Sequence, residues 1–61
     1  MNRVKELREK NNISQNNLAI KVGVTPKYIG FIENNERNPS LNVAKKIAEV
    51  FNEKIDDIFL L

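Results

Sequence analysis

The 61-residue sequence contains no cysteine, no histidine and no tryptophan, and it has only two glycines and two prolines. The absence of cysteine excludes disulfide bonds and thiol chemistry, and the absence of both cysteine and histidine excludes the usual zinc ligand sets. The core must therefore form by packing of apolar side chains alone. A chain of this length buries only about 60% of the surface that its unfolded form exposes, so marginal stability or dimerisation is expected.

Long apolar runs are also absent. No segment approaches the roughly 18 apolar residues that cross a bilayer, and no charged-then-apolar signal segment opens the chain. We therefore expect no membrane partner and a reducing, cytoplasmic setting. The net charge is only +2, which is compatible with a polyanionic partner but does not by itself indicate one.

Apolar residues recur at helical spacing along the whole chain, and no segment shows sustained strand-like alternation. This pattern predicts an all-α fold in a single domain over residues 1–61. Helices are expected from about Asn2 to Lys10, then over about 15–22, 25–34 and 41–51, with a final turn or two in 55–61. Ser14, Thr25 and Ser40 are suited to cap the second, third and fourth helices, and Gly23 to end the second. The expected core residues of the first, second and fourth helices are Val4, Leu7, Leu18, Ala19, Val22, Leu41, Ala44, Ile47, Ala48 and Phe51.

The second and third predicted helices are joined at Gly23 and Val24, which makes a helix-turn-helix pattern with glycine in the tight turn. Many helical bundles contain such a pair, so spacing alone leaves DNA binding and simple helix packing both open. The residues themselves are more specific. The stretch "ISQNNLAIKVGVTPKYIGFIENNERNPSL" resembles the Cro/CI-type helix-turn-helix repressors, whose pattern runs apolar-Ser-Gln, Leu-Ala, Gly-Val-Ser/Thr, Ile, Ile-Glu-Asn and Pro-Ser-Leu.

The resemblance covers almost the whole chain, because "LREK" and "AKKIAEVFN...IDDIF" also look like the first and last helices of short stand-alone members. It implies a compact five-helix bundle of the lambda-repressor-like type. The segment from Ser14 to Val22 would cross the DNA backbone, and the segment from Thr25 to Asn34 would enter the major groove. The partners implied are double-stranded DNA and a second copy of the chain, and no cofactor is expected.

If Ile29 and Ile32 point into the core, then Lys27, Gly30, Phe31 and Asn34 project outward together. Pro26 stands where many relatives carry a polar side chain that reads bases. The residues expected to contact bases are therefore Lys27, Tyr28 and Phe31, with Phe31 able to meet a thymine methyl group. The residues expected to contact the DNA backbone are Gln15, Asn16, Asn34, Arg37 and Asn38.

Several of these residues have a second interpretation. Lys27 could be a solvated lysine, and Tyr28 could be partly buried with its hydroxyl free for a phosphate. Phe31 could pack against the "ERNP" loop or against a neighbouring subunit. Gly30 could allow close approach to DNA or relieve crowding against the second helix. Asn34 and Asn38 equally suit a helix end and a turn, and Arg37 could reach either a phosphate or only water.

Two further expectations concern stability and assembly. The resemblance implies an ion pair between Arg8 and Glu33, which would lock the third helix to the first. The apolar end "DDIFLL" offers more apolar side chains than one inward face can cover, so residues 55–61 are expected to mediate dimerisation. The interface residues expected there are Ile58, Phe59, Leu60 and Leu61. The alternative is that Phe59 and Leu60 close the core beneath the fourth helix and only Leu61 frays.

Rival classes of function are less favoured. An enzyme is disfavoured because the sequence contains no histidine and no cysteine. The adjacent Asp56 and Asp57 cannot share one proton, because their side chains diverge by about 100° on a helix. The stronger alternative is a protein-interaction module, such as an antitoxin-like subunit with a protein partner and weak or no DNA binding. The predicted function is a cytoplasmic, DNA-binding transcriptional repressor that acts as a homodimer and associates with the nucleoid when bound to DNA.

Overall fold

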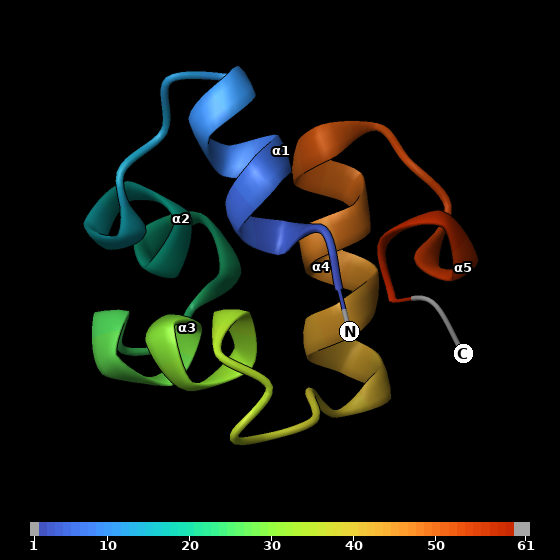
Figure 1. Cartoon of the computed structure of the whole chain (residues 1–61). Coiled ribbons are helices and arrows are strands. Elements are labelled where there is room, and N and C mark those ends of the chain that lie inside the picture. Colours follow the sequence, from blue (N-terminus) through green and yellow to red (C-terminus); the bar gives the residue numbers. More distant parts are fainter. Residues whose placement is uncertain (1, 60–61) are drawn as a thin grey trace.

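The computed structural model describes residues 2–59, and in this part of the chain it contains five α-helices in the order that the sequence predicts (Figure 1). The helices are α1 (Val4–Lys10), α2 (Gln15–Val22), α3 (Pro26–Glu33), α4 (Leu41–Phe51) and α5 (Ile55–Ile58). Helix α2 packs against both α3 and α4, α1 contacts α3 and α4, and α5 packs on α4. The all-α fold is confirmed.

The predicted caps explain where three of the helices begin. The side-chain oxygen of Ser14 accepts a hydrogen bond from the backbone N–H of Asn17 at 3.0 Å, and Ser40 accepts from Val43 at 3.2 Å. Thr25 caps α3 in the same way. Each cap satisfies one of the backbone N–H groups that the first turn of a helix leaves without an intrahelical partner.

Three of the helix ends are closed by asparagine in the left-handed conformation, which this side chain tolerates better than most. Asn12, Asn35 and Asn52 have φ angles of 56°, 61° and 54°. After each one, the next backbone N–H turns back and donates to a carbonyl of the preceding helix, as Ile13 does to Arg8 at 2.9 Å. These reversals correspond to the polar breaks that end the predicted helices.

The core contains the apolar stripe of every helix. Nearly all the expected core residues are buried, and Ile29, Ile32 and Ile47 are fully enclosed. Leu41 is the exception: we predicted it to be buried, but it is 64% exposed. The reason is its position as the first residue of α4, where the helix end extends past the neighbouring elements and leaves this side chain beside an open groove.

The N-terminal segment also differs from expectation, because α1 begins at Val4 and not at Asn2. Asn2 is extended and forms an isolated antiparallel bridge with Phe59. The backbone N–H of Arg3 donates to the carbonyl of Ile58 at 2.8 Å, so the two ends of the described chain are held together.

At the C-terminal end, two of the four residues expected at a dimer interface are buried within their own chain. Ile58 is fully buried and Phe59 is 9% exposed. Because α5 folds back onto α4 and the N-terminal segment, these side chains complete the core, which corrects our expectation that they are available to a partner. Leu60 and Leu61 lie outside the described residues.

Candidate nucleic-acid interface

The turn between α2 and α3 is short and fixed at both ends. Gly23 ends α2 with a φ of 84°, a conformation that glycine adopts without steric cost, and its N–H donates to Ala19 at 2.8 Å. Two residues later, Thr25 opens α3 by accepting a hydrogen bond from the N–H of Tyr28 at 3.1 Å. The angle at which α3 leaves α2 is therefore set by hydrogen bonds on both sides of the turn.

Helix α3 has one inward and one outward face. Ile29 and Ile32 are fully buried against the core, whereas Lys27 is exposed and Phe31 is partly exposed on the opposite face. Asn34, which ends the helix, is exposed as well. Tyr28 lies between the two faces, partly buried and packed against the core. The outward face that the sequence predicts is therefore present and free of core contacts.

Phe31 contacts two positively charged side chains. The Nζ atom of Lys27 lies 5.8 Å from the centre of its ring, and the guanidinium carbon of Arg37 lies at the same distance. Arg37 belongs to the "ERNP" loop, so the ring does contact that loop while part of it stays accessible to solvent. Our two interpretations of Phe31 are therefore not mutually exclusive.

A buried ion pair connects α3 to α1. Arg8 Nε donates to Glu33 Oε2 at 2.7 Å, and a second guanidinium nitrogen lies 3.3 Å from Oε1. The side chain of Arg8 is 12% exposed and that of Glu33 only 2%. The hydrogen bond with Glu33 raises the pKa of Arg8, although burial acts in the opposite direction. Arg8 also donates to the carbonyl of Ile13 at 3.1 Å, so it ties the end of the loop before α2 to the same pair.

Gln15 joins this network from the first turn of α2. Its Nε2 donates to Glu33 Oε1 at 2.9 Å, and the residue itself is exposed. The side-chain amide carries two N–H groups, so one remains for another acceptor. Glu33 therefore orients the residue that we expect at a DNA phosphate.

The space around Gly30 bears on the two interpretations of that residue. A Cβ atom at this position would lie 3.7 Å from its nearest neighbour, Gln15 Nε2, which is an ordinary van der Waals contact. Packing against α2 therefore does not require glycine. The close approach of DNA to the backbone of α3 at this residue stays a prediction.

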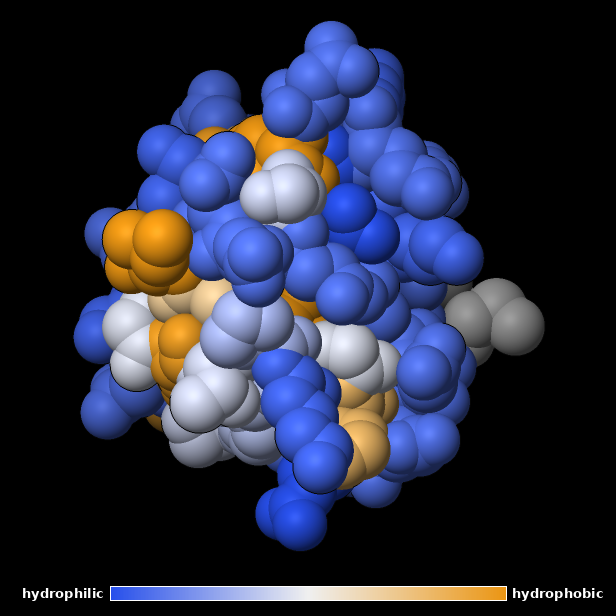
Figure 2. Space-filling view, turned by 90° about the vertical axis from the view of Figure 1, so that its left-hand side faces the viewer, coloured by the Kyte–Doolittle hydropathy of each residue, from blue (hydrophilic) through white to orange (hydrophobic). Residues whose placement is uncertain are grey.

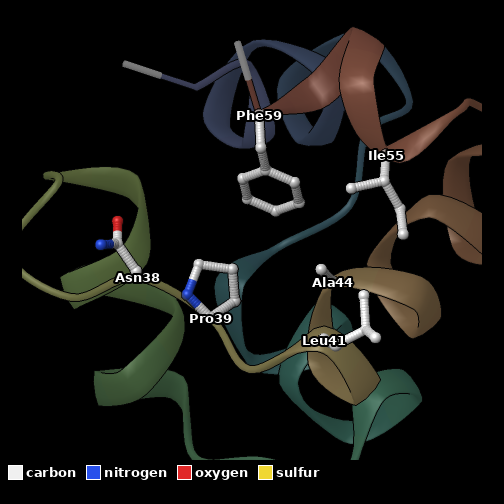
Figure 3. Close-up of a pocket in the computed structure, with 6 residues that line it drawn as sticks. All are labelled: Asn38, Pro39, Leu41, Ala44, Ile55 and Phe59. Carbon is white, nitrogen blue, oxygen red and sulfur yellow. The ribbon is translucent and has the colours of Figure 1, made fainter. Parts of the chain in front are cut away.

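The other residues expected at the DNA backbone occupy two places. Asn16 is exposed in the first turn of α2, close in sequence to Gln15, while Arg37 and Asn38 are exposed in the loop after α3. Asn38 lies beside an open apolar groove, where it lines one wall with Pro39 (Figure 3).

The surface that includes α2 and α3 is largely hydrophilic, with small separate apolar areas (Figure 2). Ile20 on α2 is 78% exposed, yet the rest of that helix's outer surface is polar or charged. Among residues 2–59, no group of acidic side chains is arranged to hold a metal ion, and no helix is long and apolar enough to cross a membrane.

One residue at this site was missed by the sequence reasoning. Asn2 Nδ2 donates to the carbonyl of Ile32 at 2.8 Å and to Asn35 Oδ1 at 3.1 Å, while its Oδ1 accepts from the N–H of Val4. Asn2 therefore lies just before the N-cap residue of α1, where it accepts the first N–H of the helix, and it donates to a carbonyl at the end of α3. An asparagine just before an apolar stripe could have suggested the first role, but the second joins residues 30 positions apart and has no local sequence signal.

Comparison with known proteins identifies the family. A model of the helix-turn-helix family matches residues 4–58, which include all five helices. The chain belongs to the Cro/CI-type helix-turn-helix family. This family comprises DNA-binding regulators of transcription, and α2 and α3 are its helix-turn-helix pair.

Related proteins in archaea and bacteria carry the name of HTH-type transcriptional regulators. An uncharacterised HTH-type transcriptional regulator of Archaeoglobus fulgidus is 53% identical over 58 residues, covering 95% of this chain and 82% of the relative. A regulator of Methanocaldococcus jannaschii is 44% identical over 59 residues, covering 97% and 89%. The Bacillus subtilis regulator YgzD is 43% identical over 60 residues, covering 98% and 91%. The helix-turn-helix domain described above therefore makes up most of each relative.

Proposed function

We propose that this helix-turn-helix protein is a sequence-specific transcriptional repressor in the cytoplasm that binds double-stranded DNA as a homodimer. The observation that carries the proposal is the outward face of α3. The inward side of α3 is held by the buried Ile29 and Ile32 and by the Arg8–Glu33 pair. Lys27 and Phe31 on the outward face remain accessible. A short helix held rigidly and presented outward is the geometry that enters the major groove in this class of proteins.

The proposed contacts divide into two sets. Lys27, Tyr28 and Phe31 would contact base edges, with Phe31 against a thymine methyl group. The N–H of Gln15 that Glu33 leaves free would donate to a phosphate, and the other backbone contacts would come from exposed residues of the helix-turn-helix and the loop that follows it. These residues are Asn16, Asn34, Arg37 and Asn38. Phosphate contacts position the protein, whereas base contacts specify the sequence.

The experiment that tests this function begins with selection of bound sites from random duplex DNA. We expect a pseudo-palindromic consensus, because two α3 helices related by two-fold symmetry would lie in successive major grooves about 34 to 36 Å apart. Failure to enrich any sequence, together with weak binding at low salt, would refute sequence-specific recognition.

Two variants then separate the proposed roles on the selected site. Phe31→Ala should relax the sequence preference, at roughly 1 to 3 kcal/mol for the lost base contact, whereas Gln15→Ala should weaken all sequences alike. Because Gln15 also contacts Glu33, the thermal stability of each variant is measured first. An unchanged preference in Phe31→Ala would exclude a base contact by this ring.

Ile58 and Phe59 are buried within their own chain, which removes them from the proposed dimer interface. The interface then depends on Leu60 and Leu61, and burial of one such side chain contributes roughly 1.5 to 3 kcal/mol, repeated on the second subunit by symmetry. Sedimentation at micromolar concentration would compare the parent with a Leu60→Glu, Leu61→Glu variant, each with and without DNA. A parent that stays monomeric in both states would exclude the homodimer.

A second candidate function is a protein-interaction module. The observation in its favour is an apolar groove lined by Leu41, Ala44, Ile55 and Phe59, with Leu41 mostly exposed at its rim (Figure 3). Salt dependence distinguishes the two functions. Binding through several phosphates weakens steeply between about 50 and 200 mM salt, whereas an apolar protein contact does not.

A further inference from the structure

The ring of Phe31 lies within cation–π distance of two side chains that come from different segments of the chain. Lys27 precedes it by one helical turn, so the two side chains share a face of α3. Arg37 follows it in the loop, and both charged groups lie 5.8 Å from the ring centre. Cation–π attraction operates within about 6 Å, so the ring attracts both groups.

The backbone brings Arg37 back to the same residue. Asn35 reverses the chain with a φ of 61°, after which the N–H groups of Glu36 and Arg37 donate to the carbonyl of Phe31 at 2.9 and 3.3 Å. Arg37 is therefore tied to Phe31 through its main chain as well as its guanidinium group. The main-chain hydrogen bonds bring Arg37 close to Phe31, and the attraction of the ring then places the guanidinium group.

Neither cation forms an ion pair with a carboxylate among residues 2–59. The ion pairs in this part of the chain join Arg3 to Glu6 and Arg8 to Glu33. Lys27 and Arg37 are both exposed, and bringing two positive charges to one ring has an electrostatic cost that an anion beside them would offset. A DNA phosphate has the charge and accessibility to do so.

We propose that Phe31 is a positioning residue that holds Lys27 and Arg37 together against the phosphate backbone of DNA. This inference rests on the proposed function, and it adds a phosphate contact of Lys27 to the base contacts proposed above for Lys27 and Phe31. It ties the guanidinium group of Arg37 to the recognition surface, because removal of the ring would leave Arg37 held to α3 by its main chain alone. Phe31 then acts through the two cations as well as through its own apolar contact.

The test uses a short mixed-sequence DNA duplex, since phosphate contacts are independent of sequence. Fluorescence anisotropy measures affinity against salt for the parent, Phe31→Leu, Phe31→Tyr, Arg37→Gln and the Phe31→Leu, Arg37→Gln double variant. Lys54→Gln serves as a control, because this exposed lysine lies before α5, away from α3. Thermal unfolding of each variant establishes that it is folded.

Each phosphate contact contributes about 0.9 to the slope of log affinity against log salt. We expect Arg37→Gln to lower the slope by about 0.9, and Phe31→Leu to lower it by about 0.9 through loss of the Arg37 contact, or by about 1.8 where Lys27 loses its contact as well. The double variant should fall no further than Phe31→Leu alone. Phe31→Tyr should keep the parental slope, because tyrosine retains the aromatic face, and Lys54→Gln should keep it as well.

The outcomes separate this inference from the proposed function. A parent that does not bind the duplex at low salt overturns both. A parent that binds with a steep slope, combined with a Phe31→Leu variant that loses affinity but keeps that slope, leaves Phe31 as an apolar contact only and overturns the positioning role. Additive effects in the double variant overturn it too. If Phe31→Leu does not fold, the NMR chemical shifts of the Arg37 side-chain protons are measured instead. In the parent and in Phe31→Tyr these protons should be shifted by the ring current of residue 31. Absence of that shift in the parent overturns the inference.

Discussion

Removal of the charge of Arg8 should destabilise this protein strongly, because it leaves Glu33 buried without its cation. We consider Arg8→Met, which keeps an unbranched apolar stem but removes the guanidinium group. Glu33 is 2% exposed and would retain one hydrogen bond, from Gln15. The variant also loses the hydrogen bond from Arg8 to the carbonyl of Ile13.

The expected loss of stability in Arg8→Met is a large share of the total free energy of unfolding. Loss of one partner from a buried ion pair costs roughly 3 to 5 kcal/mol. Since Arg8 is 12% exposed and Glu33 keeps Gln15, we expect the lower end, about 3 kcal/mol. A domain of this length has a free energy of unfolding of only about 3 to 9 kcal/mol.

The assay is urea denaturation followed by circular dichroism. With a slope of about 1 kcal/mol per molar urea, as for small domains, the midpoint should fall by about 3 M. The Arg8→Met, Glu33→Met double variant should recover most of the loss, because apolar residues often replace a buried pair at little cost. Glu6→Gln, which breaks the exposed pair with Arg3, is the matched control and should leave the midpoint unchanged.

A midpoint for Arg8→Met that equals that of Glu6→Gln would refute the reasoning, since it would show that the buried pair contributes no more than a surface contact. A double variant as unstable as the single one would also refute it, because the loss would then come from packing and not from an uncompensated charge. If Arg8→Met is unfolded in buffer, the series is repeated in an osmolyte that favours the folded state.

Further predictions concern two glycines and one asparagine. Gly30→Ala should raise the free energy of unfolding by about 0.5 to 1 kcal/mol, because the helix gains a better former and the added methyl group meets only an ordinary contact; DNA affinity should fall, and unchanged affinity would exclude close approach of DNA at this backbone position. Gly23→Ala should instead destabilise by roughly 1 to 2 kcal/mol, because its φ of 84° strains any residue with a Cβ even though the surrounding space is open. Denaturation midpoints that move in the same direction for both alanine variants would contradict this account. Asn2→Ala should destabilise by roughly 1 to 3 kcal/mol through loss of its hydrogen bonds to Ile32 and Val4, and an unchanged midpoint would show that these hydrogen bonds contribute no net stability.

Local sequence signals predicted most of the helical framework, and they failed at Asn2 and at Leu41. The cap residues Ser14, Thr25 and Ser40 act on backbone groups within three positions, so their effect is readable from the sequence. Asn2 was wrongly placed inside a helix, because its partners lie at the end of α3 and at Phe59, far along the chain. Leu41 fitted the apolar period of α4, but period alone does not show where the neighbouring elements stop.

At the candidate site, too, local features could be predicted from the sequence, whereas contacts between distant segments could not. Spacing and the family resemblance together predicted the outward face of α3, and the resemblance implied the Arg8–Glu33 pair that the structure contains. Neither showed that Glu33 also accepts a hydrogen bond from Gln15, or that Phe31 lies near both Lys27 and Arg37. Those contacts depend on the angle between helices and on the reversal of the chain at Asn35.

The all-α class, the helix order, the caps and the polar breaks follow from the sequence alone, because each depends on residues within about one turn of one another. Which apolar side chains remain for a partner depends on how the helices pack. Ile58 and Phe59 have the composition of an interface, yet they are buried because α5 folds back onto α4 and the N-terminal segment. Whether an apolar residue joins the core or the surface depends on what other segments cover it, and that coverage is a property of the whole folded chain.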